Sequence, residues 1–480
     1  MFDVIVIGGG PAGVTAALRA QELGATVALV ERGRMGGTCT NDGCVPTRVL
    51  AKAARLLRDT EQFGEYGLIG LPPQLDFARL LTRTQQVVYG IHEKKQLIGH
   101  LQHAGVAVYS EVGSARFEDP HTIRIENGLE LSSEKFILCA GGRARRIDFP
   151  GAEHTLTHSD VWSMKTLPAS LIIVGAAATG CQLASIFAGF GVKVWLLEVA
   201  PRILQVEDEC ITEIIQSAFQ QRGIQTITGI DGIDWVEKQS DGLILQYRIS
   251  GEATEITADA ILMSTGWIGN LSSLNLSAVG VQTVGQYIKV NEQFCTTAAH
   301  IFAAGDITGK MMLVQSAGYE ALAAAENAVL GSCQTKEHSI VPHGGFTDPE
   351  YGSVGITEAL AREQADCVIG QVSYADIDRA VIDGHPEGLC KLIVSKETRQ
   401  ILGAHVVGEQ ALEVVEVAAA GMAAGMTVEQ LANLEIAYPT FTAVLGLAAR
   451  KIVREMNASQ LSPEWRSLGM AIGVEWERRD

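Results

Sequence analysis

The sequence lacks an excess of basic residues, long apolar runs and repeats. It has 37 Lys and Arg against 55 Asp and Glu, and the net charge of −18 argues against nucleic acid or an anionic membrane as a partner. No apolar run reaches about 18 residues, and the N-terminus carries no basic segment that would open a signal peptide. We therefore expect a soluble, cytoplasmic protein whose 480 residues leave room for several domains.

Regular cysteine spacing is also missing, with one exception. The nine cysteines are mostly scattered, as buried thiols in a reducing compartment would be. Cys39 and Cys44, however, flank four residues in a glycine-containing segment, and a helix is expected to begin near Pro46. A helix N-terminus favours a thiolate. Zinc would need about four ligands, and no second cysteine pair or nearby histidine completes such a set. The spacing therefore favours a redox-active pair, and no metal site is predicted.

The N-terminus carries a dinucleotide-binding fingerprint. An apolar strand over residues 3–7 leads into GxGxxG, a helical pattern over 14–23 and a second strand over 26–30. The glycines allow a tight turn and a close approach of pyrophosphate to the helix N-terminus, and an acid at the second strand's end can accept from ribose hydroxyls. The predicted binding residues are Gly8, Gly10, Pro11, Ala12, Gly13 and Glu31.

These motifs together resemble one family. The segment GGTCxNxGCVP over residues 36–46, after a GxGxxG opening, resembles the flavin-dependent pyridine nucleotide–disulfide oxidoreductases, which include dihydrolipoamide dehydrogenase, glutathione reductase and mercuric reductase. Segments similar to the family's follow in order over nearly the whole chain, at 137–142, 264–266, 301–306, 346–350 and 401–405.

The resemblance implies an α/β fold with two Rossmann-like nucleotide-binding lobes and a C-terminal α+β dimerisation domain that makes a homodimer. The implied domains are an FAD-binding lobe at 1–150 and 271–340, an NAD(P)-binding lobe at 151–270, the dimerisation domain at 341–456 and an extension at 457–480.

The resemblance also implies further cofactor-binding residues. For FAD they are Gly37, Thr38, Gly113, Ala140, Gly141, Gly305 and Asp306, and for the nicotinamide nucleotide they are Gly175, Gly180, Glu198 and Gly266.

The second nucleotide-binding turn departs from the family pattern. Glu198 at a strand end suits a free ribose 2′-OH, and no Arg follows directly to take a 2′-phosphate, which favours NAD(H) over NADP(H). Ala177 stands where the pattern has its middle glycine, and its methyl group would crowd the pyrophosphate. A lobe kept only as a scaffold is therefore the alternative.

Departures also occur among the residues implied to act in catalysis. Where the family has a Lys near the flavin and a Glu that pairs with it, this chain has Arg48 and Gln182. Arg48 keeps the positive charge, which stabilises reduced flavin and thiolate, but an Arg in place of a Lys changes the geometry.

The acid/base site differs most. Tyr438 replaces the family's His, and Ala443 replaces the Glu that orients it. A phenol has a pKa of about 10 and is a poor base at neutral pH. Mercuric reductases also carry Tyr at this site, but their C-terminal cysteine pair has no counterpart here, since the last cysteine is Cys390.

Three functions stay open on this basis. The first is an FAD-dependent enzyme that passes electrons between a nicotinamide nucleotide and a small-molecule or protein disulfide through Cys39 and Cys44. The second is a mercuric-reductase-like metal-ion or quinone reductase, that is, a diaphorase. The third is a flavoprotein reduced by a protein partner rather than by NAD(P)H.

Some polar residues are expected to have no part in catalysis or binding. The acidic run 207–209 is predicted to form a surface turn, His343 and His405 to be structural, and His92 to be solvated on a polar helix.

Overall fold

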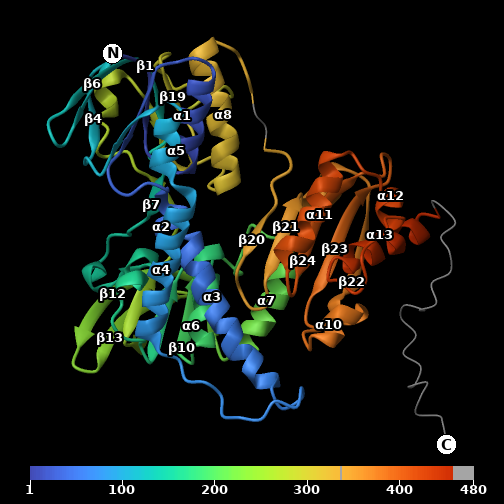
Figure 1. Ribbon diagram of the computed structural model, residues 1–480. Coiled ribbons are helices and arrows are strands. Elements are labelled where there is room, and N and C mark those ends of the chain that lie inside the picture. The colour runs from blue at the N-terminus through green and yellow to red at the C-terminus, as the bar shows by residue number, and fades with distance from the viewer. Residues whose placement is uncertain (336–337, 458–480) are drawn as a thin grey trace, which may run out of the picture. The chain divides into compact units, whose positions relative to one another are not determined.

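The structure is a computed structural model that describes residues 1–335 and 338–457 (Figure 1). The predicted extension at 457–480 lies outside the described residues, apart from its first. The chain divides into two compact units, Met1–Gln205 with Gln216–Ser339, and Val206–Ile215 with Ile340–Asp480. Among the described residues no helix is both long and apolar enough to cross a membrane. The predicted boundaries between the lobes remain predictions.

The first sheet of the first unit has the strand order β3-β2-β1-β6-β5-β4, with β19 paired to β6. β1, β2, β3, β6 and β19 run parallel, and β4 and β5 form an antiparallel extension. The central strands are continuous apolar runs because both faces of a parallel sheet are covered. The strands are β1 (Phe2–Ile7), β2 (Val27–Glu31), β3 (Ala107–Ser110), β4 (Ala115–Asp119), β5 (Thr122–Ile125), β6 (Glu130–Leu138) and β19 (Ile301–Ala303).

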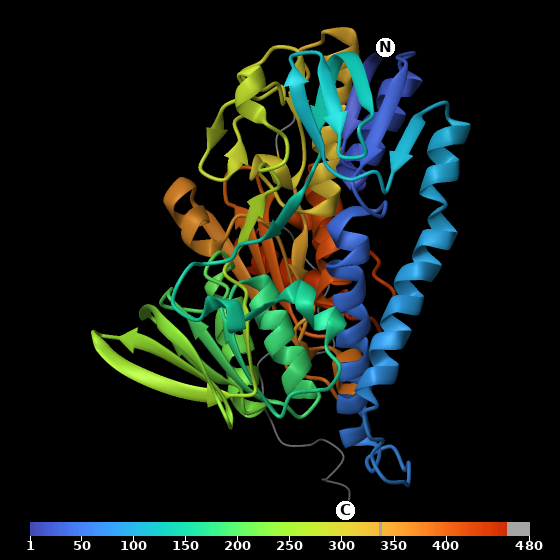
Figure 2. The same cartoon turned by 90° about the vertical axis from the view of Figure 1, so that its left-hand side faces the viewer.

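Helices α1 and α8 lie together against this sheet (Figure 1). Both present buried alanines, among them Ala16, Ala17, Ala321 and Ala324, which allow the two helices to approach closely. Helices α3 and α4 lie side by side (Figure 2). The helices of this part are α1 (Pro11–Glu22), α2 (Gly37–Asn41), α3 (Cys44–Asp59), α4 (Phe77–Lys95), α5 (Leu97–His103) and α8 (Val314–Leu330), with the 3-10 turns η1 (Thr60–Gln62), η4 (Leu276–Val279) and η5 (Asp306–Thr308).

The second sheet repeats the design with the order β11-β10-β9-β15-β8, all parallel, and an antiparallel meander β12-β13-β14 beside it. Its elements are η2 (Ala152–His154), β8 (Leu156–Thr157), η3 (His158–Ser163), β9 (Ser170–Val174), α6 (Ala178–Gly189), β10 (Lys193–Glu198), β11 (Gln225–Thr228), β12 (Ile230–Gln239), β13 (Gly242–Ile249), β14 (Glu252–Ala258) and β15 (Ala260–Met263). Helix α7 (Glu209–Gln221) begins in the segment that belongs to the second unit and ends in the first. Short pairs complete the unit, β7 (Gly142–Ala144) with β16 (Trp267–Gly269) and β17 (Thr283–Val284) with β18 (Tyr287–Ile288).

The second unit is an antiparallel sheet of order β20-β21-β24-β23-β22 that packs against α11 and α13. Its elements are β20 (His343–Gly345), β21 (Tyr351–Gly355), α9 (Glu358–Gln364), β22 (Cys367–Ser373), η6 (Tyr374–Asp376), α10 (Asp378–Ile382), β23 (Leu389–Ser395), β24 (Ile401–Val407), α11 (Ala411–Ala423), α12 (Val428–Ala432) and α13 (Ala443–Glu455). The predicted fold class, two nucleotide-binding lobes with an α+β domain, is confirmed.

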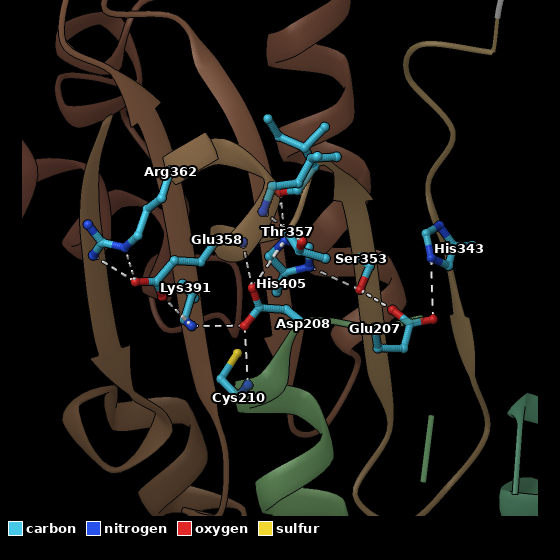
Figure 3. A network of polar contacts seen from close by, with 12 residues as sticks. Glu207, Asp208, Cys210, His343, Ser353, Thr357, Glu358, Arg362, Lys391 and His405 are labelled. Carbon is cyan, nitrogen blue, oxygen red and sulfur yellow. Dashed lines mark hydrogen bonds and ion pairs between the residues drawn. The ribbon is translucent and has the colours of Figure 1, made fainter. Parts of the chain in front are cut away.

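A polar network inside the second unit corrects one expectation. Glu207 and Asp208 are 5% and 2% exposed, so the acidic run is not a surface turn. Asp208 accepts from Lys391 Nζ (2.8 Å) and from the Glu358 backbone N–H (2.8 Å). Glu207 accepts from the Ser353 hydroxyl (2.7 Å) (Figure 3). These contacts attach the segment 206–215 to the sheet.

Candidate functional site

The turn between β1 and α1 can be built only with glycine at two positions. Gly8 has φ of +112°, and a Cβ there would lie 2.2 Å from the Cys139 carbonyl oxygen. A Cβ on Gly13 would lie 1.7 Å from the Gly8 oxygen. Glu31 reaches the turn from the end of β2 and accepts from the Gly9 N–H (2.6 Å). Pro11 and Ala12 begin α1, so its free N–H groups face the same turn.

The turn between β9 and α6 has the same geometry. Gly175 has φ of +102°, and a Cβ on Gly180 would lie 1.8 Å from the Gly175 oxygen. Glu198 accepts from the Ala176 N–H (2.6 Å). Ala177 adopts φ −77° and ψ −173°, almost the values of Gly10. An alanine therefore fits this turn without backbone strain.

Three loops bring the other residues predicted to bind FAD close to the first turn. Gly37 packs on Gly10, since a Cβ on Gly37 would lie 2.8 Å from the Gly10 Cα. The Thr38 hydroxyl lies 3.5 Å from the Gly142 carbonyl oxygen. A Cβ on Gly142 would in turn lie 3.3 Å from the Asp306 Cβ. Burial raises the pKa of Asp306.

The glycines at the remaining predicted positions adopt left-handed backbone conformations. The φ values of Gly113, Gly141, Gly266 and Gly305 are +84°, +67°, +104° and +79°. The Gly305 N–H donates to the buried Glu320 carboxylate (2.7 Å), which fixes the Ala304–Gly305 peptide just ahead of Asp306. The Ala140 carbonyl accepts from the Asn270 side chain (2.8 Å). Gly113 packs against the Glu126 side chain, since a Cβ on Gly113 would lie 2.7 Å from the Glu126 Cβ.

The two cysteines form one hydrogen-bonded pair of free thiols. Cys39 lies in α2, and Cys44 is the first residue of α3, two residues before Pro46. The hydrogen bond from Cys39 lowers the pKa of Cys44 to about 7. The same bond, together with burial, raises the pKa of Cys39. At neutral pH the pair can therefore hold one thiolate, at Cys44, and one thiol, at Cys39.

Arg48 and Gln182 lie on two helices that pack together, α3 and α6. Arg48 follows Cys44 by one helical turn, so both side chains project from neighbouring positions of one face. Gln182 donates from its amide nitrogen to the Ala178 carbonyl oxygen (2.9 Å).

The residues between the cysteines make contacts that the sequence did not suggest. Asn41 meets His92 Nε2 through its amide oxygen (2.7 Å), so the expectation that His92 is solvated is wrong. The Asp42 carboxylate accepts from Ser159 Oγ (2.6 Å), and its carbonyl accepts from Trp162 Nε1 (2.9 Å). Ser159 and Trp162 follow Asp42 by more than 110 residues, so no local pattern could have revealed them.

Tyr438 lies in the second unit and is 75% exposed. Its hydroxyl donates to the carboxylate of Asp378, the first residue of α10, at 2.5 Å. No local pattern points to Asp378 for this role, because 60 residues separate it from Tyr438. Ala443 is the first residue of α13 and offers no polar group. A carboxylate thus contacts the Tyr438 side chain, although it comes from Asp378 and not from position 443, where the family has its Glu.

Comparisons with known proteins agree with this geometry. A family model described as pyridine nucleotide-disulphide oxidoreductase matches residues 2–321, and the model of its dimerisation domain matches residues 341–449. Dihydrolipoyl dehydrogenase of Bacillus subtilis (strain 168) is 32% identical over 465 residues, covering 93% of this chain and 97% of that protein. Mercuric reductase of Lysinibacillus sphaericus is 32% identical over 454 residues, covering 93% and 82%. The solved structure of the HOCl-induced flavoprotein disulfide reductase RclA from Escherichia coli matches with a TM-score of 0.82 at 27% identity, covering 92% of this chain and 98% of that one.

Proposed function

Because the chain belongs to the pyridine nucleotide-disulphide oxidoreductase family, we propose that it passes electrons from a nicotinamide nucleotide to a disulfide through Cys39 and Cys44. It is an FAD-dependent oxidoreductase of that family. The observation that carries the proposal is the hydrogen-bonded thiol pair in which Cys44, at the start of α3, has the lowered pKa.

The chain offers a fitting cradle for FAD. The turn at Gly8 to Gly13 leaves no space for a side chain at either end, and Glu31 reaches it with a carboxylate that can accept from ribose. Asp306 and Thr38 border the same turn through the close packing of their loops. Bound FAD supplies a two-electron carrier between the nicotinamide nucleotide and the cysteine pair.

The cysteine chemistry follows from the two unlike sulfurs. Two electrons and one proton break the Cys39–Cys44 bond and leave a thiol at Cys39 and a thiolate at Cys44. Once deprotonated, Cys39 attacks one sulfur of the substrate disulfide, forms a mixed disulfide and releases the other sulfur, which takes up the proton. The Cys44 thiolate then attacks Cys39 Sγ, closes the pair again and releases the second substrate thiolate, which is protonated by solvent.

Tyr438 is proposed to face this site from the partner subunit of a homodimer, at the position where the family has its His, without acting as the general base. The dimerisation domain supports the homodimer. Because its hydroxyl donates to Asp378 (2.5 Å), the phenol is held in one orientation, but its proton already has an acceptor. General acid/base catalysis contributes about 10²–10⁴-fold where it operates, so turnover of lipoamide or glutathione disulfide should be lower by about that factor.

NAD(H) is proposed in preference to NADP(H). Glu198 ends β10 with its carboxylate at the nucleotide turn (2.6 Å to the Ala176 N–H), where a 2′-phosphate would meet a like charge. A cytoplasmic location is proposed as well, because the seven cysteines outside the Cys39–Cys44 pair are free thiols and free thiols persist in reducing compartments.

Anaerobic titration with NADH and with NADPH tests the proposal. We expect NADH to bleach the flavin and to produce a long-wavelength thiolate–flavin band. Cys44→Ser should lose the band, while Cys39→Ser should keep it and lose disulfide reduction. Cys333→Ser, at an exposed cysteine elsewhere in the first unit, is the control and should match the wild type. Full disulfide turnover by Cys39→Ser would refute the role given to the pair.

The second candidate function, a metal-ion or quinone reductase, rests on the Tyr438–Asp378 contact. Such acceptors need no proton transfer to a leaving thiolate, so a phenol that is tied to a carboxylate would not slow them. Flavin bleaching without the long-wavelength band, and quinone turnover unchanged in Cys39→Ser, would favour this function over the first.

A further inference from the structure

The segment between the two cysteines is held at its centre by η3. Asp42 contacts three residues of this turn. Its carboxylate accepts from Ser159 Oγ (2.6 Å) and lies 3.3 Å from His158 Nε2. Its carbonyl accepts from Trp162 Nε1 (2.9 Å). We call Asp42, His158, Ser159 and Trp162 the Asp42 cluster. Both the side chain and the backbone of Asp42 are thus fixed from one direction.

The turn that holds Asp42 is itself well anchored. Thr157 and Asp160 form a capping box at its start, with the Thr157 N–H and hydroxyl both donating to the Asp160 carboxylate (2.7 and 2.9 Å). His158 is buried, and its ring packs on Trp267 of β16 with centroids 4.6 Å apart. Thr157 ends β8, which is hydrogen-bonded to β15. The Asp42 cluster therefore joins the cysteine segment to a parallel sheet.

The neighbouring residue is held as well, through different partners. Asn41 donates to the Met35 carbonyl (3.0 Å) and accepts contact from His92 of α4 (2.7 Å). Of the four residues between Cys39 and Cys44, the two central ones are therefore fixed by contacts outside the segment. The conformational freedom of Asn41 and Asp42 affects how often Cys39 Sγ and Cys44 Sγ come within bonding distance.

We propose that Trp162, Ser159 and His158 are positioning residues that, through Asp42, hold Cys39 and Cys44 at bonding distance and so set the equilibrium between their disulfide and dithiol forms. The inference rests on the redox role proposed for this pair. The reduced pair already keeps its two side chains in hydrogen-bonded contact. Ring closure therefore requires little movement.

The direction of the effect follows from conformational entropy. If the cluster is loosened, the dithiol gains freedom while the disulfide stays closed by its own bond. Closing the pair then costs more, so the equilibrium moves toward the dithiol and the reduction potential becomes less negative. A lost hydrogen bond changes such an equilibrium by about three- to tenfold, and tenfold corresponds to about 30 mV for this two-electron couple.

The experiment equilibrates the FAD-loaded enzyme in dithiothreitol redox buffers and measures the fraction of the Cys39–Cys44 pair that is alkylated. Trp162→Phe removes one N–H and keeps the ring, and Ser159→Ala removes one hydroxyl. Both should shift the equilibrium toward the dithiol by about three- to tenfold. Ser159→Thr keeps a hydroxyl and should restore the wild-type value. Ser163→Ala is the matched control, because Ser163 is an exposed η3 residue whose hydroxyl donates to the Asp160 carbonyl oxygen of its own turn (2.9 Å).

The outcomes separate positioning from a merely structural role. A lower melting temperature with an equilibrium within about twofold of wild type would overturn the proposal, since every hydrogen bond contributes to stability. An equal shift in Ser163→Ala would overturn it too. Failure of the proposed function would appear in a separate measurement: Cys39→Ser would then reduce disulfides as fast as the wild type.

Discussion

At the scale of single residues, the difference between the two cysteines comes from their places in the chain. Cys44 begins α3 and accepts a hydrogen bond from Cys39, which lies in α2. A sulfur at a helix N-terminus with a donor beside it is stabilised as a thiolate. This polarity supports the proposal that Cys39 meets the substrate and Cys44 the electron carrier, the order that the family resemblance also implies.

The first prediction concerns this polarity. In the reduced enzyme, the thiolate absorbance of Cys44 should titrate near its pKa of about 7 and be lost as the pH falls below it. Cys39→Ala removes the hydrogen-bond donor, so the midpoint should rise toward the ordinary thiol value of about 8.5. Cys333→Ser should leave the midpoint unchanged. An unaltered midpoint in Cys39→Ala would show that another group stabilises the thiolate.

A second residue-scale prediction tests Tyr438 and its partner. Tyr438→Phe and Asp378→Asn should change disulfide turnover by less than about threefold, because the phenol is not the general base whose loss costs about 10²–10⁴-fold. Steady-state rates with lipoamide and glutathione disulfide measure this. Tyr438→His should restore little, since Ala443 cannot orient the ring. A hundredfold loss in Tyr438→Phe would mean that the phenol transfers the proton after all.

At the scale of elements, local motifs were predictable and distant contacts were not. The turns at Gly8 and Gly175 follow from glycine spacing, because a Cβ would lie 2.2 Å from a carbonyl oxygen at Gly8 and 2.3 Å from one at Gly175. The contact of Asp42 with Trp162, 120 residues away, leaves no trace in local periodicity. The expectation that Asp208 lies in a surface turn is wrong because an acidic run normally marks a solvated surface, and its partner Lys391 lies 183 residues further on.

The element-scale prediction uses the nucleotide turn before α6. Ala177 matches the backbone of Gly10 without strain, so Ala177→Gly should fold normally and remove only a methyl group from the pyrophosphate side. NADH should then bind about three- to tenfold more tightly, a gain below about 1.4 kcal/mol. Ala424→Gly, at the exposed C-terminal end of α11 in the second unit, is the control. Unchanged NADH affinity by equilibrium titration would show that the methyl group does not meet the nucleotide.

At the scale of the whole molecule, the second unit depends on the buried polar network around Asp208 (Figure 3). Lys391 Nζ contacts both Asp208 (2.8 Å) and Glu358 (2.7 Å), and the Lys391 and Asp208 side chains are 8% and 2% exposed. Removing one member of a buried pair leaves an uncompensated charge and costs about 3–5 kcal/mol. The network thus decides whether the segment 206–215 stays in place on the sheet.

The corresponding prediction compares two lysines of the same unit. Lys391→Met should lower the free energy of unfolding by about 3–5 kcal/mol, measured by urea denaturation of the FAD-loaded enzyme. Lys396→Met breaks the exposed pair with Asp366, whose side chains are 50% and 75% exposed, and should cost no more than about 1 kcal/mol. Equal losses in the two variants would mean that burial does not govern the network.

The last prediction follows from the pH dependence of the same network. Glu207 raises the pKa of His343 although burial opposes this, and Nε2 lies 3.4 Å from the carboxylate. A raised folded-state pKa contributes stability that is fully present below the unfolded value of about 6.5 and is lost as the pH rises through the folded value. His343→Gln should therefore cost more stability at pH 5.5 than at pH 8.5. Ser353→Ala removes a hydroxyl that donates to Glu207 (2.7 Å) and contacts His405 Nδ1 (3.2 Å), but it takes away no titrating group itself, so its cost should change less between the two pH values. Denaturation curves of both variants at the two pH values measure the difference, and a His343→Gln cost that does not change with pH would show that the imidazole holds no proton for Glu207.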